Sequence, residues 1–410
     1  MRKKFLFIVS VLIYANVLSS QILNGKISQT QPVDIIRLED NNLFFNEKLF
    51  LPDISQCIRL IRLNIPENFG ALTHESKVIL DNDLLFVPFN NRLCVYNLEG
   101  NLLFEMIGKT SFPDGTRMNV SYFFIDTQNN EIWMAQKLNE PFSIYSYDGA
   151  LIRHEPARTF NIPGVDIPLY RHFSEYAVTD KSICYATEKS VYSYGLLEGE
   201  IIKDDLFIIE NNSEAKSFFP VDNSIPIDDY GQYTNHFSPL KESYTFHFMY
   251  SDTIYSIDRS SSEINAKYYI DYGENKMDRD VSRMSNNDFM MYTMNCGFKL
   301  GLTKNVHETD SYLVFQYACY NGSNYKTVLY DTKNHIVKSK GMLDVGIFKK
   351  SPVFEFAGGQ GNKLVLVSNN HLDSLEISPI GQDRLSEEDK KEISNIQKND
   401  IIILLADLKE

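Results

Sequence analysis

Short apolar runs separated by Asn, Asp and Gly make up the stretch from Val78 to Gly108. The runs and the turns between them are Leu84–Val87, Asn90-Asn91, Leu93–Tyr96, Glu99-Gly100 and Leu102–Ile107. Apolar runs of strand length bounded by such residues are typical of antiparallel strands joined by tight turns. The stretch therefore predicts three strands of a meandering sheet.

A similar pattern recurs along the chain. Ser143-Ile-Tyr-Ser-Tyr-Asp-Gly returns 47 residues later as Ser190-Val-Tyr-Ser-Tyr-Gly, and further copies begin at Thr253 and Val328. Similarity with a period of about 40–50 residues, mostly strand, is typical of β-propeller blades. We predict an all-β, six-bladed β-propeller of four-stranded antiparallel blades with a short C-terminal helix. The units centre on residues 56–108, 119–155, 170–209, 233–270, 309–343 and 350–379.

Two intervals between units are unusually long. We predict that Lys203–Tyr233 and Glu274–Asp310 are insertions on a propeller face, which is often the binding face. Ser386 with Asp389 three residues later predicts a capping box at the start of the helix. The β-prone run Ile401–Leu405 follows. We expect a strand from one end of the chain to complete a blade begun at the other end, because closure removes an exposed sheet edge.

The N-terminus predicts export. Arg2-Lys3-Lys4 precedes the apolar run Phe5–Ala15, and small residues follow. This pattern predicts a secretory signal peptide over residues 1–20, cut near Ser19 or Ser20, which leaves residues 21–410 as one propeller domain. The apolar run is shorter than the about 20 residues that span a membrane, so we expect no stable membrane insertion after cleavage. No Cys follows the run, so we predict a periplasmic or extracellular protein without a lipoprotein anchor.

Charge and cysteine content narrow the partners and the redox chemistry. The 410 residues carry a formal net charge of −14, which repels phosphate backbones, so we expect no nucleic acid partner. The five cysteines leave at least one thiol unpaired within the chain, and their pairing stays open. Cys94 and Cys184 lie within predicted strands, where we expect small buried side chains.

Three segments carry a family resemblance. They are Leu93-Cys-Val-Tyr-Asn-Leu-Glu-Gly-Asn-Leu-Leu-Phe-Glu-Met-Ile-Gly, then Ser251-Asp-Thr-Ile-Tyr followed by Ala266-Lys-Tyr-Tyr-Ile-Asp-Tyr-Gly, and Asn399-Asp-Ile-Ile-Ile-Leu near the C-terminus. With them the chain resembles exported bacterial six-bladed β-propeller proteins of unknown function, related to NHL-repeat propellers. The resemblance implies that fold and an exported location, and no established activity. The loop Lys109–Arg117 departs from the Gly-Pro-Gly-Glu-Tyr-type loop of that family.

No catalytic motif emerges from the sequence. HExxH, GxSxG and phosphate-binding loop patterns are absent, and the eight histidines are scattered. Asp81-Asn82-Asp83 predicts a turn, and the tyrosines around Tyr244–Tyr272 predict packing between blades. Arg59, Arg62 and Arg92 are expected at a solvated edge, with the central channel as the alternative. We assign no catalytic or cofactor-binding residue, and the metal ligands stay unknown.

The leading functional hypothesis is a non-catalytic module that binds a protein or glycan ligand through one propeller face. The first alternative is a metal-dependent hydrolase or lactonase of the six-bladed type. It would hold calcium or magnesium in the central channel with about three or more oxygen ligands. These ligands would come from different blades, so no short sequence motif would reveal them. The second alternative is a structural assembly protein. Fold alone does not choose among them, because propellers carry unrelated functions.

Overall fold

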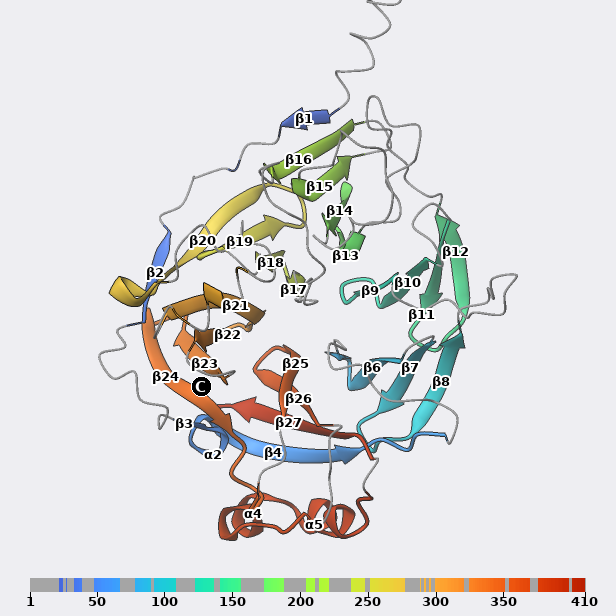
Figure 1. Cartoon of the computed structure of the whole chain (residues 1–410). Coiled ribbons are helices and arrows are strands. Elements are labelled where there is room, and N and C mark those ends of the chain that lie inside the picture. Colours follow the sequence, from blue (N-terminus) through green and yellow to red (C-terminus); the bar gives the residue numbers. More distant parts are fainter. Residues whose placement is uncertain are drawn as a thin grey trace, which may run out of the picture.

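Six sheets surround a common centre in the computed structural model (Figure 1). The chain is mostly strand, with few helices, which confirms the predicted all-β propeller class. The structure describes residues 22–24, 27, 33–38, 48–66, 78–89, 92–107, 122–135, 141–155, 173–187, 204–210, 214–220, 237–247, 251–276, 288, 291–292, 295, 299–320, 324–350, 354–368, 375–397 and 400–409.

The first three sheets follow one another along the chain. The first contains β5 (Ile79–Asp81), β6 (Leu84–Phe89), β7 (Arg92–Asn97) and β8 (Leu102–Ile107). The second contains β9 (Tyr122–Asp126), β10 (Glu131–Ala135), β11 (Phe142–Ser146) and β12 (Leu151–Glu155). The third contains β13 (Phe173–Val178), β14 (Ser182–Thr187), β15 (Asp204–Glu210), β16 (Glu214–Pro220) and the N-terminal β1 (Ile22–Asn24).

The last three sheets each take one further strand from the N-terminal segment. The fourth contains β17 (Phe237–Pro239), β18 (Ser243–His247), β19 (Thr253–Asp258), β20 (Ile264–Asp271) and β2 (Asp34–Arg37). The fifth contains β21 (Lys299–Glu308), β22 (Tyr312–Tyr320), β23 (Asn324–Asp331), β24 (Ile336–Asp344) and β3 (Lys48–Phe50). The sixth contains β25 (Glu355–Gln360), β26 (Lys363–Ser368), β27 (Ile402–Leu408) and β4 (Ser55–Arg62).

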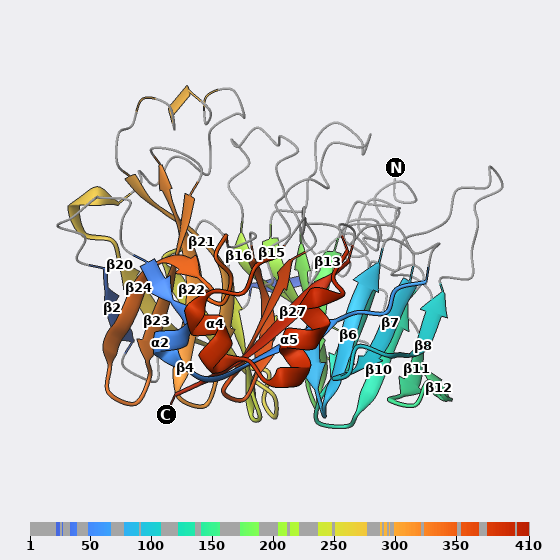
Figure 2. The same ribbon diagram turned by 90° about the horizontal axis from the view of Figure 1, so that it is seen from below.

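Apart from the N-terminal strands β1 to β4, the strands of each sheet run outward from the centre of the ring in chain order (Figure 1). The tight turns between first and second strands therefore gather at one end of the ring, which we call the turn face. It carries residues 82–83, 127–130, 179–181, 240–242, 309–311 and 361–362. Because neighbouring strands are antiparallel, the third strand of each sheet starts at the opposite end, which we call the connection face. Figure 2 shows the ring from the side.

The N-terminal segment runs around the outside of the ring (Figure 1). β1, β2 and β3 pair in parallel with the outer strands β16, β20 and β24. β4 then pairs antiparallel with β27, with Arg62 opposite Ile402 and Arg59 opposite Leu405. A strand near the N-terminus thus completes the sheet that holds the last strand, which confirms the predicted closure.

The described helices are short. α2 (Leu51–Ile54) and the 3₁₀ helix η2 (Gly273–Asn275) connect strands, and α4 (Pro379–Arg384) and α5 (Glu387–Ser394) lie between β26 and β27. The predicted capping box is confirmed, with Ser386 and Asp389 bonding reciprocally. The predicted short helix is present as α5, and the aliphatic run after it forms the buried strand β27, while the additional helix α4 was not predicted. The Asp389 carboxylate also accepts from the backbone amide of Leu60 at 3.1 Å, which covers the edge of β4.

Side chains from neighbouring sheets meet in apolar layers. One layer packs Leu85, Val87 and Tyr96 of the first sheet against Val365 and Ile403 of the sixth. Another packs Tyr268 and Tyr272 of the fourth sheet against Phe315 and Tyr330 of the fifth. Tyr244, Tyr268 and Tyr272 are each less than 5% exposed, which confirms the predicted packing role for these rings.

Both predicted insertions contain sheet strands instead. β15 and β16 lie within Lys203–Tyr233, and β21 begins within Glu274–Asp310. Charged residues inside these strands, such as Lys216 and Lys304, interrupt the apolar pattern that marks the other strands. The predicted first unit is also corrected, because β4 belongs to the sixth sheet.

Candidate functional site

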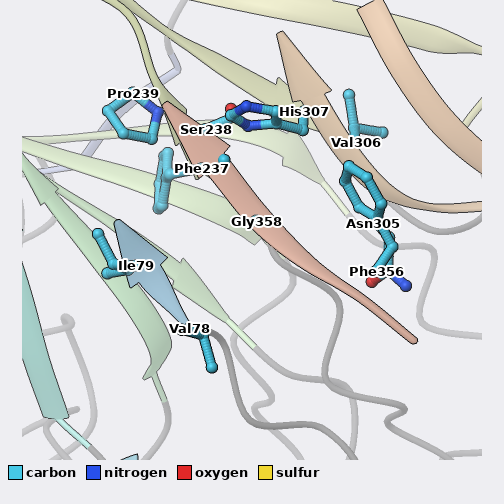
Figure 3. Close-up of a pocket in the computed structure, with 11 residues that line it drawn as sticks. Val78, Ile79, Phe237, Ser238, Pro239, Asn305, Val306, His307, Phe356 and Gly358 are labelled. Carbon is cyan, nitrogen blue, oxygen red and sulfur yellow. The ribbon is translucent and has the colours of Figure 1, made fainter. Parts of the chain in front are cut away.

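A small cavity lies among the innermost strands of four sheets (Figure 3). β5, β17, β21 and β25 line it mainly with apolar side chains, and Ser238, Asn305 and His307 add polar groups. It offers about 20 Å³ to the centre of a water molecule, and one water needs about 10–15 Å³ on that measure. The cavity therefore has room for water but is far too small for a drug-sized ligand.

A buried serine and histidine meet at this cavity (Figure 3). Ser238 Oγ on β17 lies 2.9 Å from His307 Nδ1 on β21, and both residues are 4% exposed. A Cβ on Gly359 would lie 2.4 Å from His307 Nε2, so only glycine lets β25 pass this close to the imidazole. The His307 ring also packs with Phe356, with ring centroids 6.2 Å apart. The pair is thus fixed by three sheets.

The orientation of this pair differs from that in Ser–His hydrolases. There the hydroxyl bonds to Nε2 of the imidazole, while an acid orients Nδ1–H. Here the Ser238 hydroxyl is hydrogen-bonded to Nδ1 of His307 instead, and the backbone amide of Glu308 donates to the same Ser238 Oγ at 3.3 Å. The geometry suits a fixed structural contact better than an activated nucleophile.

The carboxylate of Glu308 binds the fourth sheet. It accepts from Thr245 Oγ1 at 2.5 Å, Lys267 Nζ at 2.7 Å and Tyr268 Oη at 2.6 Å, and the residue is 5% exposed. Burial, followed by the negative charge of Glu308, raises the pKa of Tyr268 far above its ordinary value. Tyr268 therefore stays protonated and donates. This network joins the fourth and fifth sheets next to the cavity.

Asp81 joins three sheets on the turn face. Its carboxylate accepts from Tyr147 Oη at 2.5 Å and from the side-chain amide of Gln360. Burial raises the pKa of Asp81 above its ordinary value, against the opposing effect of these hydrogen bonds. The predicted turn is confirmed, with Asn82 and Asp83 at φ 47° and 59°. The Asp81 side chain itself is buried, because the residue is 2% exposed.

A buried ion pair links the second and fourth sheets across the third. Arg259 donates to Asp126 at 3.0 Å, and their side chains are 6% and 4% exposed. Arg259 also donates to Tyr244 Oη at 2.8 Å and lies with its Cζ 4.8 Å from the centre of that ring. Tyr244 Oη in turn donates to the carbonyl of Val178 on β13 at 2.7 Å. All three sheets are thereby locked together.

The candidate residues from the sequence lie away from this site. Arg59 and Arg62 lie on the outer strand β4 in ion pairs, which confirms the predicted edge placement for these two. The predicted solvated edge is wrong for Arg92, which is 8% exposed on the interior strand β7 and pairs with Glu105. His154, His247 and His335 lie on other strands and turns, and the remaining histidines, apart from His307, fall outside the described residues. Neither Ser238 nor His307 carried a sequence signal, because only strand register brings them together.

Within the described ranges, no three His, Cys, Asp or Glu residues are grouped to hold a metal ion. Calcium or magnesium in the channel therefore stays a prediction. Cys94 and Cys184 are fully buried, as predicted, and Cys57 is exposed. Cys296 and the side chain of Cys319 fall outside the described residues.

Comparison with known proteins supports the fold and leaves the family open. No family model and no curated protein matches the chain. A solved structure from Bacteroides fragilis, described as an exported protein, is 14% identical, covers 92% of this chain and 100% of its own, and has a TM-score of 0.60. A DUF4221 member from Bacteroides vulgatus is 11% identical over 87% of this chain and 97% of its own, with a TM-score of 0.46.

At 14% identity, the likeness to the Bacteroides fragilis structure shows the fold alone. A streptogramin B lyase reaches a TM-score of 0.40 at 10% identity over 85% of this chain and 97% of its own. Among the described helices, none has the length and apolar character needed to cross a membrane.

Proposed function

We propose that this chain is an exported, non-catalytic propeller that binds a protein or glycan ligand at the connection face. The observation that carries the proposal is the contrast between tight hairpins at one end of the sheets and long intervals at the other. Among the described residues, the cavity at the ring centre admits about 20 Å³ of water centres, and the Arg259–Asp126 pair crosses between sheets near the turn face. A ligand of ordinary size does not fit that cavity.

The connection face is the better candidate of the two faces. On the turn face the first hairpins are tight, with two residues between Asp81 and Leu84 and two between Gln360 and Lys363. At the other end, one sheet finishes and the next begins, and the sequence intervals between them are long, as between Ile107 and Tyr122 or between Pro220 and Phe237. Binding residues concentrate on long connections that a rigid scaffold positions.

The proposal also includes the number of blades, the signal peptide and the location of the mature protein. Each of the six sheets would be one blade of a six-bladed ring related to NHL-repeat propellers. Residues 1–20 would be removed as a signal peptide, leaving residues 21–410 in the periplasm or outside the cell. An exported structural neighbour supports this location.

A thermal-shift screen of residues 21–410 tests the proposal. The protein is treated with EDTA and then heated with a panel of glycans, with divalent cations, and with both. A ligand that binds the native state stabilises it by mass action, by about 2.7 kcal/mol at a hundredfold excess over Kd, and so raises the Tm. A rise with a glycan in EDTA supports the proposal. A rise that requires calcium or magnesium, together with hydrolysis of a lactone, would replace it by the metal-dependent hydrolase.

A further inference from the structure

Two of the six sheets have outer edges that no described strand or helix covers. β1, β2 and β3 lie on the outer strands of the third, fourth and fifth sheets, and α5 caps β4 in the sixth. β8 in the first sheet and β12 in the second end their sheets without such a cover among the described residues. Open edges of this kind accept further strands.

The fourth and fifth sheets show what a covering strand does. β2 pairs in parallel with residues 268–271 of β20, so that Asp34 lies opposite Tyr268 and Ile36 opposite Ile270. Ile36 is fully buried and packs in one cluster with Tyr268 and Tyr330. Asp34 accepts from Tyr330 Oη at 2.7 Å. β2 is thus held by two side chains two positions apart. The carboxylate of Asp34 accepts a hydrogen bond from one tyrosine, and Ile36 packs with both aromatic rings.

The first and second sheets carry the same pair without a cover. A bulge precedes Tyr268 on β20 and precedes Phe104 on β8, which makes the two rings equivalent. Likewise Tyr330 and Tyr145 face the bulges of β24 and β12. Tyr268 and Tyr330 are 4% and 1% exposed. Phe104 and Tyr145 are only half-buried, although both pack against the cluster between their sheets.

The extra residue at each bulge also differs between the covered and the open sheets. In the covered sheets the extra residues are Lys267 and Lys338, which turn back to Glu308 at 2.7 Å and Asp331 at 3.5 Å. In the open sheets they are Leu103 and Ile152, which are 50% and 49% exposed. Edge lysines discourage pairing with another chain, and exposed aliphatic residues do not.

We propose that the outer edge of β8 is a docking site for an extended segment of a partner protein. The segment adds as a parallel strand along residues 104–107, as β2 does along residues 268–271. It carries a hydrogen-bond acceptor that reaches the hydroxyl of Tyr145, and an aliphatic residue two positions later that covers Phe104. Strand addition of this kind gives affinity through the backbone and specificity through alternate side chains.

A displayed library of random octapeptides, selected on residues 21–410, tests this site. Enriched peptides are expected to share the acceptor and the aliphatic residue at that spacing. Phe104→Ala removes the ring that the aliphatic residue covers, and it should weaken binding about tenfold or more. Tyr145→Phe keeps the ring and should remove only the preference for the acceptor. Ile336→Ala is the control, because it also shortens an apolar side chain that is open to solvent, but Ile336 lies on the covered β24.

Three outcomes would overturn the docking site. Selection enriches no such pattern, or the enriched peptides bind Phe104→Ala and Ile336→Ala equally well. Alternatively, light scattering detects a dimer of the unmodified protein that Phe104→Ala converts to a monomer, which would assign this edge to a second copy. Melting curves confirm that each variant is folded, and Tyr145→Phe keeps the test decisive if Phe104→Ala unfolds. The connection face is untouched by all three variants, so this result is independent of the proposed function.

Discussion

Arg259 and Asp126 form an ion pair of 3.0 Å although their sheets are not neighbours in the ring. Asp126 ends β9 in the second sheet, and Arg259 follows β19 in the fourth. Asp126 also accepts from the backbone amide of Gln128 at 3.1 Å, so the pair is anchored at its acidic end. The pair therefore contributes to closing the ring as well as to local stability.

Replacing Arg259 by Met should destabilise the whole ring. Asp126 would stay buried without its cation, and breaking a buried pair from one side costs about 3–5 kcal/mol. Urea unfolding of the variant and the unmodified protein measures the difference. Lys349→Met is the control, because its pair with Glu376 has side chains 59% and 67% exposed and is screened by water. Equal midpoints for Arg259→Met and Lys349→Met would contradict the closing role.

Asp81 predicts a pH dependence of a definite sign. Burial raises its pKa in the folded state above the unfolded value of about 3.9. The folded state therefore holds a proton that the unfolded state has lost, and stability falls as the pH rises through this window. Asp81→Asn carries no ionisable group and should lose this dependence. We expect the Tm of Asp81→Asn, relative to the unmodified protein, to increase from pH 4 to pH 6, and a constant difference would contradict the shift.

Gly359 should resist substitution more strongly than its neighbour Gly361. A Cβ at Gly359 would lie 2.3 Å from the carbonyl oxygen of Lys363 and 2.4 Å from His307 Nε2. Gly359→Ala should therefore cost about 1–3 kcal/mol through overpacking. Gly361 has φ +55° and nothing within 4 Å, so Gly361→Asn should be nearly neutral, since Asn tolerates that conformation. Thermal unfolding of both variants makes the comparison within one hairpin.

The exposed and the buried cysteines should react with a thiol-labelling reagent at different rates. Burial raises the pKa of Cys94 to about 12, so almost no thiolate forms at pH 8. Cys57 is exposed on β4, although burial of part of its side chain raises its pKa as well. We expect iodoacetamide to alkylate Cys57 at least about tenfold faster than Cys94, as measured by peptide mass spectrometry. Comparable rates would show that β7 is exposed in solution.

The sequence predicts the fold class because each hairpin carries its own signal. Leu84–Val87 and Leu102–Ile107 alternate with turn residues, and the structure places β6 and β8 there. Closure by β4 was also predictable, since an aliphatic strand at the C-terminus needs a partner. The strands β15 and β16 were missed because charged residues break their apolar pattern.

The buried polar contacts could not be predicted in the same way. Ser238 and His307 are 69 residues apart, and Arg259 and Asp126 are 133 residues apart. Such pairs depend on the register and the twist of sheets that are distant in sequence, and no local spacing encodes them. The open edge of β8 likewise becomes visible only when equivalent positions in different sheets are compared.

Site-specific photo-cross-linking tests the proposed binding face most directly. A diazirine residue, which reacts with proteins and glycans alike, replaces Pro141 or Asp252 next to the third strands, or Gln128 or Asp310 in the first hairpins. Each protein is mixed with the exported fraction of the producing cells and irradiated. The proposal predicts adducts at positions 141 and 252 and none at positions 128 and 310. Adducts confined to the turn face would contradict it.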